Sequence, residues 1–267
     1  MPPAHIFIAR HSERVDHMDA EFGKTYSRPH DSPITDNGVT FAEKLGDYLV
    51  HHYGVRPSEV VFLSSPLTRC VQTSHGIVTG ILRSAAGTSP DTIPIYIEPA
   101  VMEGPYWMFY DMSKNVAVVE PNGGPFHCPE PVYHDAAFHH ASTSRHVQLH
   151  NPFPLHPAPH FAVEDNKLTD ASFPERCARG AQTLLTIPEL DGKTVVLVAH
   201  GETVWRALHA LKGTTMESEI HSPAYTGFVH VTCSGEGGAE TQVRVEFEPF
   251  ATPHLSETPK ETSGVSA

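Results

Sequence analysis

Two histidines and three arginines fall in three short segments of this chain, and each segment follows an apolar run. The segments are Arg10-His11-Ser12-Glu13-Arg14, Ser65-Pro66-Leu67-Thr68-Arg69 and Ala199-His200-Gly201-Glu202. Guanidinium groups bind the nonbridging oxygens of a phosphate through charge-assisted, often bidentate hydrogen bonds. A neutral imidazole nitrogen can attack phosphorus. These residue types together predict phosphoryl transfer through a phosphohistidine.

Such a reaction also needs a proton for the oxygen that leaves phosphorus. A carboxylic acid or a second histidine must therefore stand opposite the nucleophile. Glu103, in the segment EPAVMEGPYW, is the preferred donor, and Glu98 and Asp111 are its competitors. A solvated loop carboxylate without a catalytic role is the alternative for each of them.

The three segments follow predicted strands of an alternating strand and helix pattern. Short buried strands are predicted at residues 5–9, 60–63, 93–97 and 194–199, and helices at 39–52, 67–83, 172–187 and 203–212. Residues 226–233 and 242–248 read as an antiparallel pair. This order predicts a three-layer α/β/α sandwich with a mostly parallel central sheet. Ligands bind at the carboxyl ends of such strands, so the three segments are expected to converge on one site.

Length and composition narrow the class of protein. We expect one domain over residues 1–250 of the 267, with an irregular insertion at about 104–165 and a disordered tail at 251–267. The formal charge of −13 argues against nucleic acid and anionic membranes as partners. The apolar run near the N-terminus is too short for a signal peptide, and the cysteines (Cys70, Cys128, Cys177, Cys233) form no paired motif. A cytoplasmic protein with free thiols is expected.

The motifs resemble those of the histidine phosphatase superfamily, also called the phosphoglycerate mutase-like superfamily. Its hallmark is an Arg-His-Gly motif at a strand end, which corresponds here to Arg10-His11-Ser12. The segments ARHSERVDHMDAEFGK, SPLTRCVQTS, DSPITDNG and IHSPAYTGFVHV are most similar to the branch that holds the phosphatase domain of the suppressor of T-cell receptor signalling proteins and the ecdysteroid-phosphate phosphatases. The likeness runs from about residue 5 to residue 233 and leaves out residues 121–160.

The resemblance implies a metal-independent phosphatase, without a cofactor, whose insertion caps the active site. It implies His11 as the phosphorylated nucleophile and Glu103 as the proton donor. The implied phosphate ligands are Arg10, Arg14, Arg69 and His200. Ser12 departs from the family's glycine, whose backbone carbonyl is expected to fix the tautomer of the nucleophile. A serine can serve in the same way unless the backbone there needs a positive φ.

Several alternatives stay open on the sequence alone. Arg14 can pair with Glu13 or Asp16 instead of binding phosphate, and Ser12 leaves room for a pseudophosphatase that only binds. A phosphoglycerate mutase is disfavoured, because His17 and Met18 stand where mutases have a Trp-Asn pair. The histidine-rich stretch over residues 127–160 invites a metal, but its spacing is poor for one. The expected partner is a small phosphorylated substrate with an apolar or aromatic leaving group, or a phosphoprotein, and a homodimer is possible.

Overall fold

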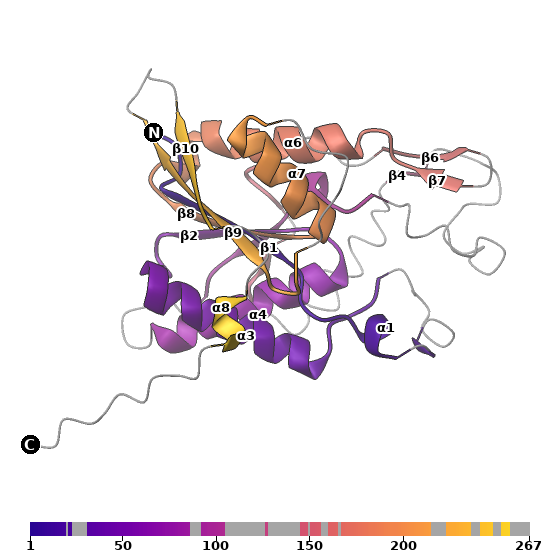
Figure 1. The fold of residues 1–267 in the computed structure, drawn as a ribbon, viewed down its shortest axis with the longest axis horizontal. Helices are drawn as coiled ribbons and strands as arrows, with labels where there is room; N and C mark the ends of the chain where they lie inside the picture. Colours follow the sequence, from indigo (N-terminus) through magenta and orange to yellow (C-terminus); the bar gives the residue numbers. More distant parts are fainter. Residues whose placement is uncertain are drawn as a thin grey trace, which may run out of the picture.

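A seven-stranded mixed sheet forms the centre of the protein in the computed structural model (Figure 1). The structure describes residues 1–19, 21–22, 31–85, 92–104, 126–127, 145–148, 150–155, 160–164, 167–214, 223–235, 241–247 and 252–256. The strand order is β10-β9-β1-β8-β2-β3-β5. The strands are β1 (His5–Arg10), β2 (Val60–Ser64), β3 (Ile95–Ile97), β5 (Val147–Gln148), β8 (Thr194–Ala199), β9 (Phe228–Ser234) and β10 (Gln242–Phe247). The five strands from β1 to β5 in this order are parallel, β9 pairs antiparallel with β1, and β10 pairs antiparallel with β9.

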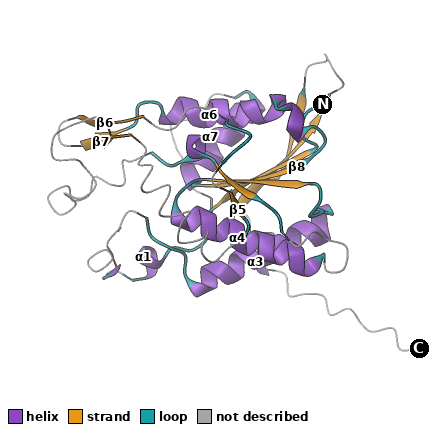
Figure 2. Cartoon of the chain, turned by 180° about the vertical axis from the view of Figure 1, so that it is seen from behind, coloured by secondary structure: helices purple, strands orange, loops and turns teal. Residues whose placement is uncertain are grey.

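Helices cover both faces of this sheet, as Figures 1 and 2 show. Helices α3 (Asp36–Tyr53) and α4 (Thr68–Ser84) lie on one face, and α6 (Phe173–Thr183) and α7 (Gly201–Lys212) lie on the other. The predicted α/β/α sandwich with a mostly parallel sheet is therefore confirmed. No helix among the described residues is long and apolar enough to cross a membrane.

Alternating side chains of the central strands build the two layers of the core. In β1, Ile6 and Ile8 pack in the cluster that includes α6 and α7, while Phe7 and Ala9 pack in the cluster on the side of α3 and α4. Burial on both faces explains why the strand is an uninterrupted apolar run in the sequence. It also leaves only the ends of the strand free to carry polar groups.

Helices α3 and α4 approach each other closely because glycines line their contact. A Cβ added at Gly46 would lie 2.1 Å from the carbonyl oxygen of Ile77, and one added at Gly80 would lie 2.1 Å from that of Glu43. No side chain fits at either position. The N-terminus of α3 is capped by Thr35, whose Oγ1 accepts a hydrogen bond of 2.9 Å from the backbone amide of Gly38.

The structure differs from the expected elements at their ends, in the insertion predicted at about 104–165 and in the tail predicted at 251–267. The predicted helix 172–187 ends at Thr183 and continues as the 3-10 turns η3 (Leu184–Thr186) and η4 (Pro188–Leu190), and the turn η1 (Pro99–Val101) follows β3. A small sheet of β4 (Phe126–His127), β6 (His160–Glu164) and β7 (Lys167–Thr169) falls in and beside the insertion that was predicted to be irregular. Short strands form there because they pair with each other in an antiparallel ladder.

The expected disordered tail contains a short helix. Helix α8 (Pro253–Ser256) contacts α3, and its His254 is buried. The expectation is wrong for these four residues because a buried side chain anchors them, which polar composition alone could not reveal. Residues 257–267 lie outside the described residues.

Candidate active site

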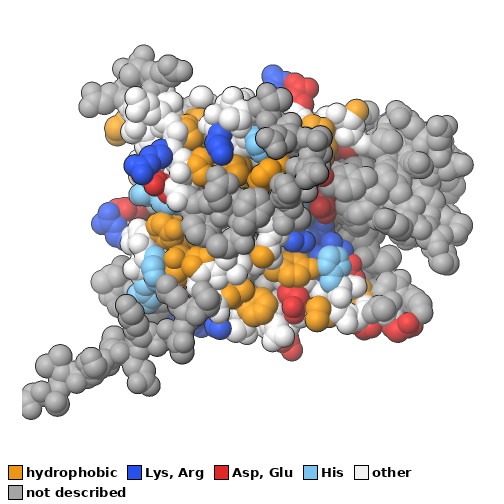
Figure 3. Space-filling view, in the orientation of Figure 1, with side chains coloured by type: hydrophobic (Ala, Val, Ile, Leu, Met, Phe, Trp, Pro, Cys, Tyr) orange, Lys and Arg blue, Asp and Glu red, His pale blue; other side chains and the backbone are white. Residues whose placement is uncertain are grey.

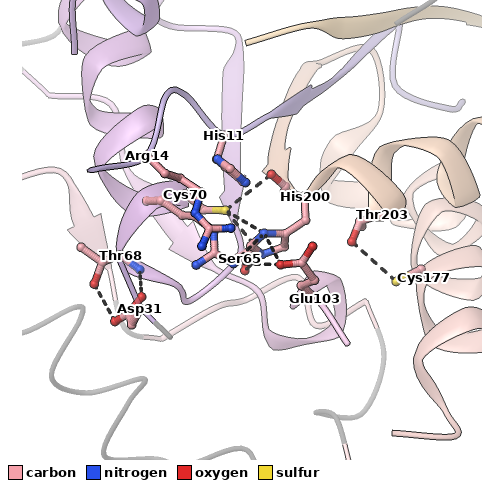
Figure 4. Close-up of polar contacts among 12 residues, drawn as sticks. His11, Arg14, Asp31, Ser65, Thr68, Cys70, Glu103, Cys177, His200 and Thr203 are labelled. Carbon is pink, nitrogen blue, oxygen red and sulfur yellow. Dashed lines mark hydrogen bonds and ion pairs between the residues drawn. The ribbon is translucent and has the colours of Figure 1, made fainter. Parts of the chain in front are cut away.

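The three predicted segments meet at the carboxyl ends of the neighbouring strands β1, β8 and β2. The backbone amide of His11 donates to the carbonyl of Ala199 over 2.8 Å, and that of Ser65 donates to the carbonyl of Val198 over 2.9 Å. These bonds continue the sheet register into the loops. They bring the rings of His11 and His200 to a centroid distance of 5.4 Å (Figure 4).

His11 is held as a neutral imidazole with a defined tautomer. Its Nδ1–H donates to the carbonyl of Ser12 over 2.9 Å, which leaves Nε2 with a lone pair. Burial lowers the pKa of His11 well below its ordinary value, and the positive charges of Arg69 and Arg10 lower it further. A neutral ring with a free Nε2 lone pair is the form that a nucleophile needs.

Ser12 fits this loop without strain. Of the described non-glycine residues, only Thr226 has a positive φ, so the backbone at Ser12 does not require a glycine. The amide of Ser12 donates to Thr73 Oγ1 over 2.8 Å, and its hydroxyl donates to the carbonyl of Gly38 over 2.7 Å. The serine is therefore bonded to α4 and α3, and its own carbonyl remains available to His11.

His200 faces the same space from the start of α7. The guanidinium Nη2 of Arg69 donates to its Nδ1 over 3.3 Å, so its Nε2–H donates to Ser65 Oγ over 2.8 Å. Burial lowers the pKa of His200 well below its ordinary value, with Arg69 as the largest electrostatic cause. Cys70 Sγ lies 3.6 Å from Nε2, and burial raises the pKa of this thiol to about 12. A protonated, buried thiol is a poor nucleophile. We therefore assign Cys70 a packing role against His200.

Each of the three arginines has a partner in the structure. The fully buried Arg69 donates to Glu103 Oε2 over 2.9 Å. Arg14 pairs with both carboxylate oxygens of Asp16, and Arg10 donates to the carbonyl of Pro223 and lies over the Tyr225 ring. All three cations nevertheless lower the pKa values of His11 and His200, so their charges converge on these rings. In Figure 3, Lys or Arg side chains lie beside a His side chain right of the centre of the face in view, and other Lys, Arg and His side chains lie apart from them.

Glu103 is the candidate carboxylate that the structure places with the histidines. Its Oε2 lies 3.5 Å from His200 Nδ1, and its side chain is 15% exposed. Glu98 is buried elsewhere and accepts bonds from the amides of Ala100 and Leu155 and from Asn151 Nδ2. Burial raises the pKa of Glu98 to about 7, but its three bonds tie backbone segments together. Asp111 lies outside the described residues.

Two residues that shape the site lie in segments that carry the family resemblance, but the sequence assigned neither of them a role. Asp31 accepts from the amide and the hydroxyl of Thr68, each over 2.7 Å, and so fixes the first turn of α4 that carries Arg69. Tyr225 lies with its ring centroid 5.9 Å from that of His11, and its hydroxyl contacts His17 Nδ1. The carboxylate and the tyrosine are remote in sequence from the residues they contact, so spacing could not assign them.

The metal-binding alternative concerns a stretch that lies mostly outside the described residues. Where side chains are described, no group of three or more His, Cys, Asp or Glu residues could hold a metal ion. His146, which belongs to the stretch, accepts from the amide of Ile93 over 3.3 Å at Nδ1 and packs against His75. It therefore has a structural role at the edge strand β5.

Comparisons with known proteins show what the sequence and the fold resemble. Residues 6–89 match the model of the histidine phosphatase superfamily, branch 1. No curated protein matches the chain. A structure of the ecdysone phosphate phosphatase of Bombyx mori with tungstate superposes with a TM-score of 0.61 at 19% identity, covering 98% of this chain and 97% of that one.

Two bacterial structures show the same fold at lower similarity. YhfR of Bacillus stearothermophilus has a TM-score of 0.51 at 19% identity, covering 92% of this chain and 97% of its own. A putative alpha-ribazole-5'-P phosphatase of Escherichia coli has a TM-score of 0.52 at 17% identity, covering 93% and 98%. At these identities the likeness establishes the fold that carries the site.

Proposed function

We propose that the chain, whose residues 6–89 match the model of the histidine phosphatase superfamily, hydrolyses a phosphate monoester through a phosphohistidine on His11. The observation that carries the proposal is the state of His11. Its ring is buried and neutral, Ser12 fixes its tautomer, and its Nε2 is left with a lone pair among three converging arginine charges. This combination serves a nucleophile that attacks an anionic group.

In the proposed first step, the phosphate of the substrate replaces carboxylate oxygens as the hydrogen-bond acceptor of the arginines. Arg69 turns from Glu103 to a phosphate oxygen, and Arg14 shares its charge between Asp16 and the phosphate. His11 Nε2 then attacks phosphorus, and the bond between phosphorus and the ester oxygen breaks. Glu103, which takes up the proton of the substrate's phosphate monoanion once Arg69 has turned away, delivers it to the leaving oxygen. Once they hold the phosphate, the guanidinium groups stabilise the charge of the transferring group.

In the second step water attacks the phosphorus of phospho-His11. Glu103 accepts a proton from this water, the bond from phosphorus to Nε2 breaks, and phosphate leaves. His11 returns to the neutral tautomer that the Ser12 carbonyl holds, and His200 supplies a further phosphate contact. Three arginines supply the charge that a metal ion supplies in other phosphoryl-transfer sites, so we propose that the reaction needs no metal and no cofactor.

The side of the site near Tyr225 supports a substrate with an apolar or aromatic leaving group. The Tyr225 ring packs beside His11 and His17, and the adjoining Met18 is 65% exposed. Aromatic and thioether groups bind apolar surfaces of a ligand. A small phosphorylated molecule or a phosphoprotein side chain could present such a group. We also propose a reducing, cytoplasmic setting, which the free thiols of Cys70, Cys177 and Cys233 support.

The test compares wild type with His11→Ala on an aryl phosphate in the presence of EDTA. We expect wild-type turnover and a loss of about 10⁴-fold or more in the variant. The variant His51→Ala, which removes an exposed histidine far along α3, is the matched control and should keep full activity. Quenched wild-type enzyme should carry one acid-labile phosphate on His11.

Three results would overturn parts of the proposal. Equal turnover in wild type and His11→Ala would refute catalysis by His11, and no turnover in either would favour a pseudophosphatase that only binds. Isomerisation of 2- or 3-phosphoglycerate without release of phosphate would identify a mutase. Loss of activity in EDTA that zinc restores would refute metal independence and direct attention to the histidine-rich stretch.

A further inference from the structure

The turn before β9 covers one side of the candidate phosphate site. The carbonyl of Pro223 accepts from Arg10 Nη1, and the guanidinium carbon of Arg10 lies 4.5 Å from the centroid of the Tyr225 ring. The same ring lies beside His11, and its hydroxyl is bonded to His17. The placement of Arg10 therefore depends on the conformation of residues 223–227.

This conformation is an unusual one. Thr226 has a φ of 55°, the left-handed region that a β-branched residue rarely adopts. Such a backbone persists only where the surroundings hold it, and it recurs at functional sites. The amide of Thr226 donates to the carbonyl of His11 over 3.4 Å, so the turn is tied directly to the nucleophile's own backbone.

A chain of two hydrogen bonds holds Thr226 from the C-terminal helix. The Thr226 hydroxyl lies 2.6 Å from the carbonyl of Tyr225, to which it donates its one proton. His254 Nε2 lies 2.8 Å from the same hydroxyl oxygen, so His254 must be the donor there. The order of donation is His254 to Thr226 to the backbone of Tyr225.

His254 is well suited to a fixed donor. It is 3% exposed, on helix α8, which lies against α3 (Figure 1). The rings of Tyr48 and Phe228 pack on it, each with a centroid distance of 6.2 Å. Burial and the charge of Lys44 lower the pKa of His254 to about 4, so the ring is neutral at physiological pH. A neutral ring with its proton on Nε2 is the form that donates to Thr226.

We infer that helix α8 is part of the active site, with His254 acting through Thr226 as a positioning residue for Tyr225 and Arg10. The sequence predicted a disordered tail for this segment, yet its helix holds the backbone of the turn that contacts Arg10. The inference rests on the proposed function where it concerns turnover. Its structural part, the bracing of the turn, can be measured without any reaction.

The test uses two variants at His254 and one at Thr226. His254→Leu keeps the volume and removes the donor, whereas His254→Gln keeps an amide N–H that can reach Thr226 Oγ1. Thr226→Val keeps the shape of the side chain and removes the hydroxyl. His52→Leu is the matched control, because it removes a histidine that stacks on Tyr48 from α3 without contacting the turn. Circular dichroism and thermal unfolding show that each variant is folded.

Hydrogen exchange of residues 223–230 measures the bracing directly. We expect faster exchange in His254→Leu and Thr226→Val, and wild-type exchange in His254→Gln and in the control. In His254→Leu and Thr226→Val, kcat/KM on an aryl phosphate and the affinity for orthovanadate should each fall about 10- to 100-fold, because a misplacement near 1 Å has that cost. Both quantities should stay unchanged in His254→Gln and in the control. Unchanged exchange in His254→Leu would overturn the inference. Absence of turnover in wild type would instead overturn the proposed function.

Discussion

Replacing Ser12 by glycine tests whether the serine impairs catalysis at this site. The variant restores the residue that the superfamily motif carries, and it leaves the backbone carbonyl that accepts from His11 Nδ1. Because Ser12 has no positive φ, glycine brings no relief of strain there. We therefore expect Ser12→Gly to hydrolyse an aryl phosphate with a kcat within about twofold of wild type, which corresponds to less than about 0.5 kcal/mol in barrier.

The same change should cost stability by an amount that the contacts define. It removes the buried hydrogen bond of 2.7 Å from Ser12 Oγ to the Gly38 carbonyl, a type of bond with a net contribution of about 0.5–1.5 kcal/mol. Glycine also adds backbone freedom to the unfolded chain, which costs roughly 0.5–1 kcal/mol. The free energy of unfolding should fall by about 1–2.5 kcal/mol in total.

Urea denaturation and steady-state kinetics on the same preparations measure both quantities. Ser12→Ala is the companion variant, because it removes only the hydroxyl and separates the hydrogen bond from the backbone effect. A tenfold or greater rise of kcat in Ser12→Gly would refute the reasoning, since it would mean that the serine holds His11 in an unproductive position. Unchanged stability in both variants would show that the bond to Gly38 contributes nothing.

Three further predictions follow from other contacts. Glu103→Gln should lower kcat/KM, which reports formation of phospho-His11, by about 10²–10⁴-fold for an alkyl phosphate and far less for an activated aryl phosphate, because only the poor leaving group needs a proton. Gly46→Ala should lower the free energy of unfolding by about 3 kcal/mol in urea, because its Cβ would lie 2.1 Å from the Ile77 carbonyl. The pKa of His254 is about 4 in the folded protein and about 6.5 in the unfolded chain. The contribution of the neutral ring to the free energy of unfolding is therefore fully present above pH 6.5 and is lost as the pH falls from 6.5 through 4. Wild type should therefore lose about 3 kcal/mol more than His254→Gln between pH 7 and pH 4 in urea titrations.

Each of these predictions has its own control or contradicting result. Glu98→Gln removes a buried carboxyl outside the site and should show no dependence on the leaving group, so equal losses for both substrates in Glu103→Gln would exclude a proton donor there. Gly180→Ala is the helical control for Gly46, since its Cβ meets only the Leu155 side chain at 3.6 Å. Parallel pH profiles for wild type and His254→Gln would contradict the depressed pKa of this histidine.

The elements that carry the site were largely predictable because their signals are local. The run TVVLVA became β8 at the predicted bounds, and β9 and β10 form the predicted antiparallel pair. A strand buried on both faces must be apolar throughout, whatever its neighbours are. The convergence of His11 and His200 also followed, because adjacent parallel strands end at the same edge.

The partners of the site residues were not predictable from spacing. Arg14 had two acidic neighbours as candidates, and only the structure shows that Asp16 takes both ends of its guanidinium. Glu98 and Glu103 stand five positions apart in one loop, yet one is buried among backbone amides and the other faces Arg69. Local sequence says that a carboxylate is present, whereas its surroundings decide what it can do.

The sequence by itself determined the layered fold, the polar segments that follow the central strands and the set of residues that could bind a phosphate. Those properties depend on periodicity and on residue type, which neighbouring positions carry. The tertiary structure alone decided that Ser12 fits, through Gly38 26 residues away and Thr73 61 residues away, and that His254 braces Thr226 from the C-terminal helix. Hydrogen bonds between remote segments depend on how the layers pack, and no pattern along one segment records that packing.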